Sequence, residues 1–187
     1  MYQNNYNGMH WNGRCTVCEI SQSIFYSNRI AGISLQEGFK NGFVTSNLAF
    51  NNLSEGIEMD DYDGTGAGTC SPQGPTDVCP YDQTGNLFAG NTIYSTGKDW
   101  LGEDGTSNPT GILIGRSGGC TTTECLAASF ANNAFRNNII NPWGANNAIP
   151  ALSYQDNAGS VTGACGATCQ AWASSATFDG LLSYQTD

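Results

Sequence analysis

The chain has 187 residues, a net charge of −10 at neutral pH and only 12% charged residues. The length suffices for one domain with a substantial core, and the low charge content argues against a coiled coil or a disordered tail. The acidic balance disfavours nucleic-acid binding, which needs basic surface, and no apolar run approaches the roughly 18 residues that a membrane-spanning helix requires.

A short strand pattern recurs at a fixed interval near the beginning of the chain. Gly8–Asn12 has the order glycine, apolar, any residue, apolar, polar, and the same order returns at Gly32–Gln36 and Gly56–Asp60, 24 residues apart each time. This alternation with a period of two predicts β-strands that bury one face.

Asparagines recur with the same interval. Asn4, Asn28 and Asn52 are 24 residues apart. We predict that Asn28, Asn52 and Asn138 lie at coil corners and form hydrogen-bonded ladders, as asparagines do in stacked β structures. Asn52 also begins a glycosylation sequon ending at Ser54, but an inward ladder position would not be modified.

The strand patterns continue past insertions into the rest of the chain, where the copies are weaker. The predicted later copies are Phe88–Asn91 and Phe130–Asn133, which match Val44–Asn47; Gly111–Gly115, which matches Gly56–Asp60; and the less regular Asn147–Ala151 and Thr177–Leu182.

A period near 24 residues that carries several short strands predicts one domain, an all-β, right-handed parallel β-helix (β-solenoid) of about five to seven coils. We expect regular coils over residues 1–60, coils with loop insertions over 61–152, and a last coil or tail over 153–187. The pattern begins in mid-coil without a capping helix, so we expect further N-terminal coils or a partner that stacks on this end.

The eight cysteines fall into close pairs along the chain. Eight cysteines allow 105 pairings, but this spacing favours a disulfide between each cysteine and its neighbour, which implies an extracellular or cell-surface location. Zinc is the alternative for the first pair, although no second pair of the same spacing accompanies it. The predicted disulfides are Cys15–Cys18, Cys70–Cys79, Cys120–Cys125 and Cys165–Cys169.

The segment 47–57 resembles the repeats of the pectin-lyase-like superfamily of parallel β-helices. The resemblance covers residues 2–60 tightly and 86–152 loosely. It implies a secreted protein that binds a polysaccharide, either a polysaccharide lyase or a glycoside hydrolase acting in a groove on the solenoid face. The superfamily also contains non-catalytic members, so a cell-surface adhesin or structural module is the alternative.

The densest acidic segment runs from Glu55 to Asp63, where an insertion begins. Alternation places Glu58 and Asp60 on one outward face, with Asp61 and Asp63 at the turn. These four carboxylates suit a hard cation, so we predict a calcium site there. Crowded carboxylates also raise one pKa, which suits general acid–base catalysis. A salt bridge or a solvated acidic turn is the structural alternative.

Strand stacking predicts that Arg116 lies one coil above Asp61. In related lyases a Lys or Arg near the calcium abstracts the proton, so the resemblance implies Arg116 as base or substrate clamp, with Lys98 as second choice. The predicted catalytic set is therefore Glu58, Asp60, Asp61 and Arg116. Leu113 departs from the family, because lyases with a lysine base carry that lysine at the equivalent position.

Insertions in repeat proteins usually gather on the binding face. Aromatic residues within them can stack on sugars, whereas Trp11 matches core positions and His10 has no nucleophile as a partner. We therefore expect Trp11 in the core and His10 on the surface. The predicted insertions are 61–85, 97–110, 117–127 and 141–147, and the predicted substrate-binding residues are Tyr62, Lys98, Trp100 and Trp143.

Overall fold

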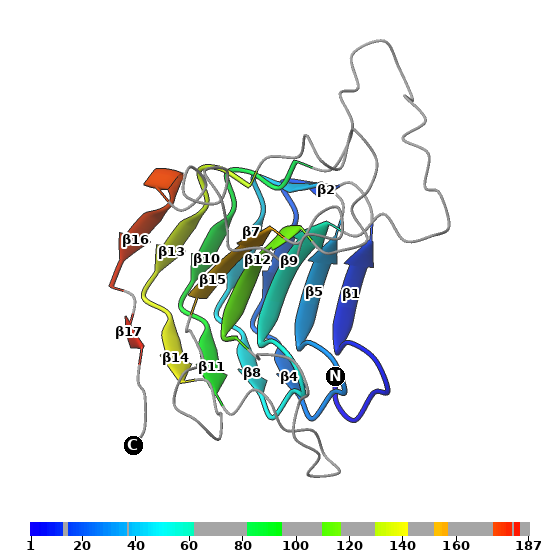
Figure 1. The fold of residues 1–187 in the computed structure, drawn as a ribbon. Coiled ribbons are helices and arrows are strands. Elements are labelled where there is room, and N and C mark those ends of the chain that lie inside the picture. Colours follow the sequence, from blue (N-terminus) through cyan, green and yellow to red (C-terminus); the bar gives the residue numbers. More distant parts are fainter. Residues whose placement is uncertain are drawn as a thin grey trace.

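The protein is described here from a computed structural model. The described residues are 1–12, 15–36, 38–61, 82–94, 110–116, 130–141, 152–156, 174–180 and 182–183. They form an all-β structure in which the strands are short and pair in parallel, consistent with a β-solenoid (Figure 1).

Three parallel sheets of five strands run side by side, and strands that follow one another in the chain belong to different sheets. Sheet I contains β1 (Met9–Asn12), β5 (Ile33–Gln36), β9 (Ile57–Asp61), β12 (Ile112–Arg116) and β15 (Leu152–Asp156). Sheet II contains β3 (Glu19–Ser21), β7 (Phe43–Thr45), β10 (Leu87–Ala89), β13 (Ala134–Arg136) and β16 (Thr177–Asp179). Sheet III contains β4 (Ile24–Tyr26), β8 (Leu48–Phe50), β11 (Thr92–Tyr94), β14 (Ile139–Asn141) and β17 (Leu182–Ser183). A separate pair joins β2 (Cys15–Thr16) to β6 (Phe39–Lys40).

The strand register agrees with the repeat at the beginning of the chain. Met9 pairs with Ile33 and Ile33 with Ile57, so each step covers 24 residues. The next step in sheet I pairs Ile57 with Ile112, 55 residues later, because an insertion intervenes. The same pairings stack His10, Ser34, Glu58 and Leu113 in one column across four strands.

The predicted match of Phe130–Asn133 to Val44–Asn47 is wrong. Phe88 pairs with Val44 as expected, but its partner on the other side is Phe135. The physical reason is that two successive corners carry asparagine five residues apart, Asn133 and Asn138, so the sequence pattern fits both registers.

The predicted match of Asn147–Ala151 to the strand that begins at Gly56 is also wrong, because β12 pairs in register with β15, whose first residue is Leu152. Thr177–Leu182 does contain the last described strands, yet it continues sheets II and III and does not copy the strand that begins at Gly56. Backbone pairing decided these registers where the side-chain pattern was weak.

The corners between sheets II and III are two residues long. The first corner residue adopts a positive φ, as at Ser46 (56°), Gly90 (64°) and Asn137 (51°). The second is an asparagine in three of them, at Asn47, Asn91 and Asn138, and a serine in the first, at Ser23. A left-handed residue turns the chain sharply, and Gly and Asn adopt that conformation at the lowest cost.

These corner asparagines form a buried ladder along the axis. The Asn91 Oδ1 accepts hydrogen bonds from the backbone N–H of Asn47 at 3.0 Å and from its side-chain amide at 3.1 Å, and the Asn91 amide donates to the Asn138 Oδ1 at 3.0 Å. It also donates to the Val44 carbonyl at 2.7 Å. The ladder therefore satisfies the buried backbone groups that a tight corner leaves without partners.

The predicted ladder residues are confirmed, but they belong to two different ladders. Asn28 and Asn52 lie in a ladder that begins at Asn4, with an Asn28 amide to Asn52 Oδ1 distance of 2.9 Å. Asn138 belongs to the ladder with Asn91. Asn52 is 0% exposed, so its sequon is inaccessible in the folded chain.

The repeated glycines have a steric cause at the same corners. A Cβ atom on Gly32 would lie 2.7 Å from the Gly56 carbonyl oxygen and 2.8 Å from the Asn52 side-chain nitrogen. The strand of sheet I thus begins where the backbone passes too close to the ladder and to the next coil for any side chain.

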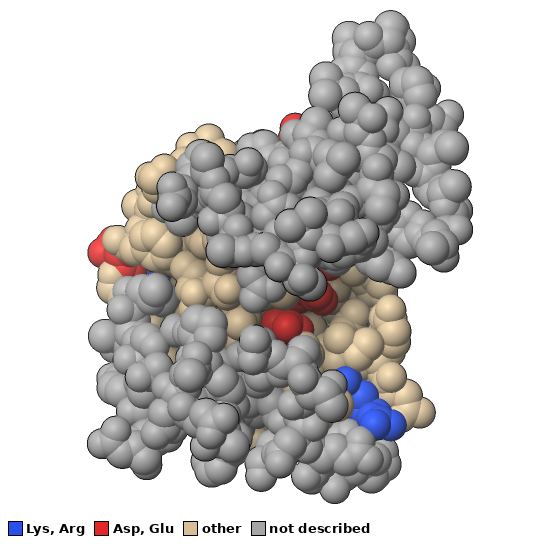
Figure 2. All heavy atoms as spheres, in the orientation of Figure 1, with Lys and Arg blue, Asp and Glu red and all other residues tan. Residues whose placement is uncertain are grey.

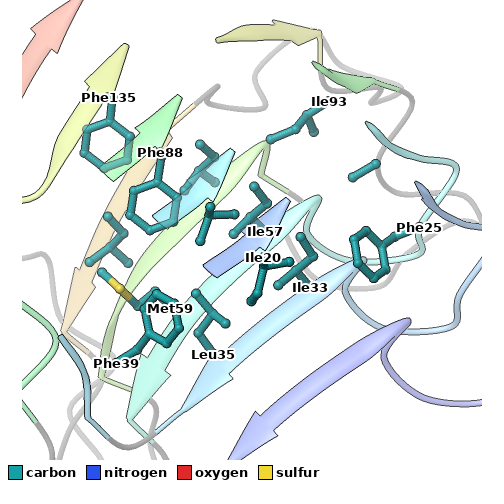
Figure 3. Packing of buried hydrophobic residues seen from close by; sticks show 14 of the residues in the cluster. Ile20, Phe25, Ile33, Leu35, Phe39, Ile57, Met59, Phe88, Ile93 and Phe135 are labelled. Atoms are coloured by element: carbon teal, nitrogen blue, oxygen red, sulfur yellow. The ribbon is translucent and has the colours of Figure 1, made fainter. Parts of the chain in front are cut away.

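Inward-facing side chains from all three sheets fill one continuous core (Figure 3). Phe88 and Phe135 stack with ring centroids 5.1 Å apart, so identical residues pack above one another from coil to coil. Trp11 packs against this core but stays half-buried, in the column predicted for it. The fully buried residues include Ile33, Leu35, Ile57, Met59, Phe88, Ile93, Phe135 and Ile140.

A second aromatic stack runs along the outside of sheet III. Tyr2, Tyr26, Phe50 and Tyr94 lie with successive ring centroids 5.0, 4.9 and 5.0 Å apart and nearly parallel planes. Because the ring faces contact one another, the outer surface of this stack presents ring edges.

Replacing a ladder asparagine should be costly. We expect Asn91→Ala to lower the free energy of unfolding by about 3 kcal/mol, because it leaves the buried Asn47 N–H and the Val44 carbonyl without partners. Urea unfolding followed by circular dichroism measures this. Asn132→Gly, at an exposed corner residue with φ 60°, is the matched control and should change stability by less than about 0.5 kcal/mol. Equal losses in the two variants would contradict the role of the ladder.

Val17 should be a point of backbone strain. This β-branched residue has φ 61° and is 66% exposed, whereas Asn41, Gly85 and Asn132 have positive φ at the equivalent corners of later coils. Val17→Asn should therefore raise the free energy of unfolding by about 1 kcal/mol. Thr16→Asn, on the neighbouring exposed residue, should bring no such gain, and a Val17→Asn variant no more stable than the wild type would refute the interpretation.

Candidate functional site

Carboxyl groups gather on the outer face of sheet I. Figure 2 shows acidic side chains reaching the surface in the middle of the face that carries β5, β9 and β12 in Figure 1. The side chains of Ile57 and Met59 on β9 are 0% exposed and lie in the core, so the intervening Glu58 and following Asp60 project to the opposite face. The predicted pair is therefore brought together, at a backbone separation of roughly 7 Å.

The insertions enter the chain on both sides of this sheet. Additional residues separate β9 from β10, β11 from β12 and β14 from β15, whereas the two-residue corners between sheets II and III keep their length. Insertions in repeat proteins often lie on the binding face, so the positions of these insertions favour sheet I as the binding face.

Glu55 is a site residue that was not predicted. It precedes β9, is only 6% exposed, and its carbonyl accepts the backbone N–H of Gly32. Burial raises the pKa of its carboxyl, and hydrogen bonds from Ser54 and from its own backbone oppose that rise. The 24-residue repeat could have predicted that Glu55 is buried, because Glu55 lies one repeat after Ala31, which is itself buried.

Glu58 is half-buried beside this second acid. Burial, and to a smaller extent the nearby negative charge of Glu55, together raise the pKa of the Glu58 carboxyl to about 7. The Ser34 hydroxyl, on the neighbouring strand, opposes the rise and has the smallest of the three effects. Near neutral pH the Glu58 carboxyl is thus divided between its protonated and ionised forms.

Ser34 is paired with Glu58 across β5 and β9 and is 0% exposed. Its Oγ makes no hydrogen bond of ordinary geometry to any described residue, although the hydroxyl lies near enough to Glu58 to lower the pKa of that carboxyl. The Thr110 hydroxyl, in the segment that pairs with Gly56, is likewise buried and without such a partner in the described part of the chain. A buried hydroxyl of this kind is unusual and points to a bound group or a small displacement that satisfies it.

Asp60 is 7% exposed, and its backbone carbonyl accepts a hydrogen bond from the buried Gln83 amide at 2.9 Å. Gln83 precedes the next strand of sheet II, so this contact ties the far end of β9 to the neighbouring part of the coil.

Arg116 pairs in register with Asp61 on β9 and with Asp156 on β15. The predicted position of Arg116 above Asp61 is confirmed at the level of the backbone. The side chains of these residues lie outside the described part of the structure, so their roles as base, clamp or ligand stay predictions.

Several predicted site residues fall wholly outside the described residues. Within residues that are described, no group of three or more His, Cys, Asp or Glu side chains is arranged to hold a metal ion. Calcium binding by Glu58, Asp60, Asp61 and Asp63 stays a prediction. The predicted residues outside the described ranges are Tyr62, Asp63, Lys98, Trp100 and Trp143.

His10 lies on the surface, as predicted. Its Nε2 is 2.8 Å from the Gln36 Oε1, and its ring lies 5.8 Å from that of Tyr6 in a tilted arrangement. These two neighbours among the described residues are an amide and a phenol, and neither is a Ser or Cys nucleophile.

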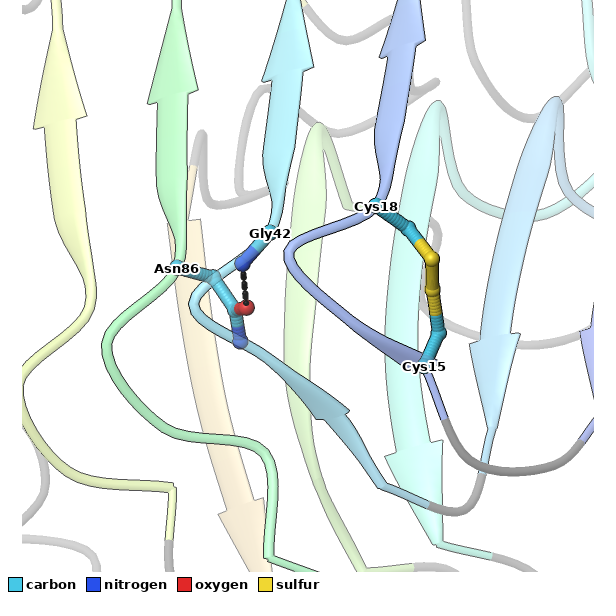
Figure 4. The surroundings of a disulfide bond; sticks show 4 residues. All are labelled: Cys15, Cys18, Gly42 and Asn86. Atoms are coloured by element: carbon cyan, nitrogen blue, oxygen red, sulfur yellow. Dashed lines mark hydrogen bonds between the residues drawn. A yellow bond between two sulfur atoms is a disulfide. The ribbon is translucent and has the colours of Figure 1, made fainter.

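Cys15 and Cys18 form a disulfide, with Cα atoms 5.9 Å apart (Figure 4). It closes the loop that carries Val17, next to the corner where the Gly42 N–H donates to the Asn86 Oδ1 at 2.9 Å. This pair agrees with the first of the predicted disulfides. The other predicted pairs, Cys70–Cys79, Cys120–Cys125 and Cys165–Cys169, lie outside the described residues.

Comparisons of the chain with protein-family models, with curated proteins and with solved structures found no match in any of the three. Among the described residues, none forms a helix with the length and apolar character needed to cross a bilayer.

The raised pKa of Glu58 predicts a pH dependence of stability. This pKa is about 7 in the folded chain against an ordinary 4.5, so between these values the folded state binds more protons than the unfolded state. The free energy of unfolding contributed by Glu58 should therefore fall as the pH rises from about 4.5 to 7 and stay constant above. Glu58→Gln should gain stability relative to the wild type across that window, in urea unfolding performed with chelator.

A direct titration checks the cause. Carbon NMR of the Glu58 carboxyl should give a midpoint near pH 7 in the wild type. Glu55→Gln should lower that midpoint, because it removes the neighbouring charge while leaving Glu58 in place. An ordinary glutamate midpoint in the wild type would contradict the description of this site.

Proposed function

We propose that this chain is a secreted, carbohydrate-active β-helix protein that cleaves a glycan on the outer face of sheet I. The observation that carries the proposal is the pair Glu58 and Asp60, two carboxyls on one strand face, of which Glu58 is protonatable near neutral pH. The parallel sheets support the right-handed β-helix of the pectin-lyase-like superfamily that the sequence resembles, and the disulfide supports an oxidising location.

The chemistry we propose is general acid–base hydrolysis. Glu58 donates its proton to the oxygen of the leaving sugar, and the Asp60 carboxylate assists a water on the other side of the bond. Alternate residues of a strand are roughly 7 Å apart along the backbone. This spacing is compatible with the inverting glycosidases, whose two carboxyl groups are about 6.5–9.5 Å apart. In this mechanism the buried Glu55 acts through Glu58 and touches no substrate.

A non-catalytic adhesin or structural module is the second candidate. The continuous asparagine ladders and the outer stack of Tyr26, Phe50 and Tyr94 favour it, because they would stiffen the solenoid even if sheet I had no catalytic role. This module would bind a glycan or another partner without turnover.

The test is incubation of the purified chain with a panel of polysaccharides, with calcium and with chelator. We expect new reducing ends without the absorbance of unsaturated sugars. Calcium-dependent absorbance would instead identify a lyase and support the calcium site. Binding without either product would favour the non-catalytic module.

The variants locate the activity. Glu58→Gln and Asp60→Asn should each lower kcat by about 100-fold or more, because each removes one partner of the acid–base pair. Glu19→Gln, which removes an exposed carboxylate from β3 of sheet II, is the matched control and should retain full activity. Full activity of Glu58→Gln in a folded sample would contradict the role of Glu58 as the general acid.

A further inference from the structure

The charge of sheet I bears on the kind of glycan that can bind there. β9 carries Glu58 and Asp60 on its outer face, and Asp61 follows them in the sequence. The one basic residue of β12, Arg116, pairs with an aspartate on each side, Asp61 and Asp156. Acidic residues therefore outnumber basic ones on these strands even when Arg116 is counted, and the whole chain has a charge of −10.

An anionic polysaccharide would meet this face at a disadvantage. A polyuronate carries about one carboxylate per sugar, and like charges a few ångströms apart repel strongly where water is partly excluded. The positions of Glu58 and Asp60, which are half-buried and buried, reduce the screening that salt would otherwise supply. A neutral sugar chain avoids this repulsion.

Ser34 adds an observation that does not depend on charge. Its hydroxyl is 0% exposed, belongs to the strand next to Glu58 and finds no ordinary hydrogen-bond partner among described residues. A donor held beside carboxylate acceptors matches a sugar hydroxyl, which both donates and accepts. The combination is suited to uncharged ligands rich in hydroxyl groups.

We infer that the sheet I site takes a neutral polysaccharide, with Glu58 and Asp60 accepting hydrogen bonds from sugar hydroxyls and Ser34 donating one. This inference rests on the proposed function, because it names the substrate class of the same site.

The test is calorimetric binding to soluble neutral polysaccharides, such as a mixed-linkage glucan and a mannan, and to polygalacturonate and alginate. Each titration is run in chelator and in calcium, at low and high salt. We expect at least one neutral chain to bind in chelator, with an affinity that changes less than twofold with salt, and the polyuronates to bind at least tenfold more weakly.

The outcomes separate the two proposals. Polyuronate binding as tight as neutral binding, or binding that requires calcium, would overturn the neutral-glycan inference and leave the carbohydrate function standing. No binding to any glycan, in a sample shown to be folded, would overturn the carbohydrate function and the inference with it.

Two variants test the residues. Ser34→Ala should weaken neutral-glycan binding about fivefold or more, yet leave Tm unchanged or higher, because the hydroxyl has no ordinary partner in the free chain. Ser21→Ala, on β3 of sheet II, is the matched control and should bind as the wild type does. The double variant Glu58→Gln/Asp60→Asn should bind polygalacturonate at least tenfold more tightly than the wild type, and no gain would refute the electrostatic exclusion.

Discussion

The structure depends on satisfying the backbone at its corners. Three short strands per turn of the chain require sharp bends, and each bend leaves N–H and C=O groups buried with no strand partner. The asparagine side chains supply these partners: the Asn91 amide donates to the Val44 carbonyl, and the Asn91 Oδ1 accepts the Asn47 N–H, both in the preceding coil. Each rung therefore depends on the rungs before and after it, which links the coils in a cooperative series.

The corners also decide which side chains can form a site. A two-residue corner with one left-handed residue fixes the phase of the strand that follows, and a slip of one residue would turn every side chain to the other face. Because the register of β9 is fixed, Ile57 and Met59 lie in the core. Glu58 and Asp60 therefore lie together on the outer face of the sheet. The placement of these two carboxyl groups on one face therefore depends on the corner geometry elsewhere in the coil.

Burial gives the acids of sheet I different properties from ordinary surface carboxylates. Glu55 has almost no exposed surface, and its effect on Glu58 is transmitted over a short distance in a poorly hydrated environment. A solvated acidic turn, the structural alternative for this segment, would not hold a carboxyl with a pKa of about 7. The burial of the pair is what distinguishes a chemically useful arrangement from a charged loop.

The sequence by itself determined the repeat, the strand faces and the ladder residues in the regular coils, because steric and hydrogen-bonding demands at Gly32 and Asn52 recur at constant spacing. It could not choose between Asn133 and Asn138 as the corner matching Asn47, since both fit a local pattern that only cross-strand pairing resolves. It pointed to Glu58 and Asp60 by alternation alone. Only the tertiary structure showed Glu55 beneath them and Ser34 beside them, because burial and proximity depend on neighbouring coils that lie 24 or more residues away in the chain.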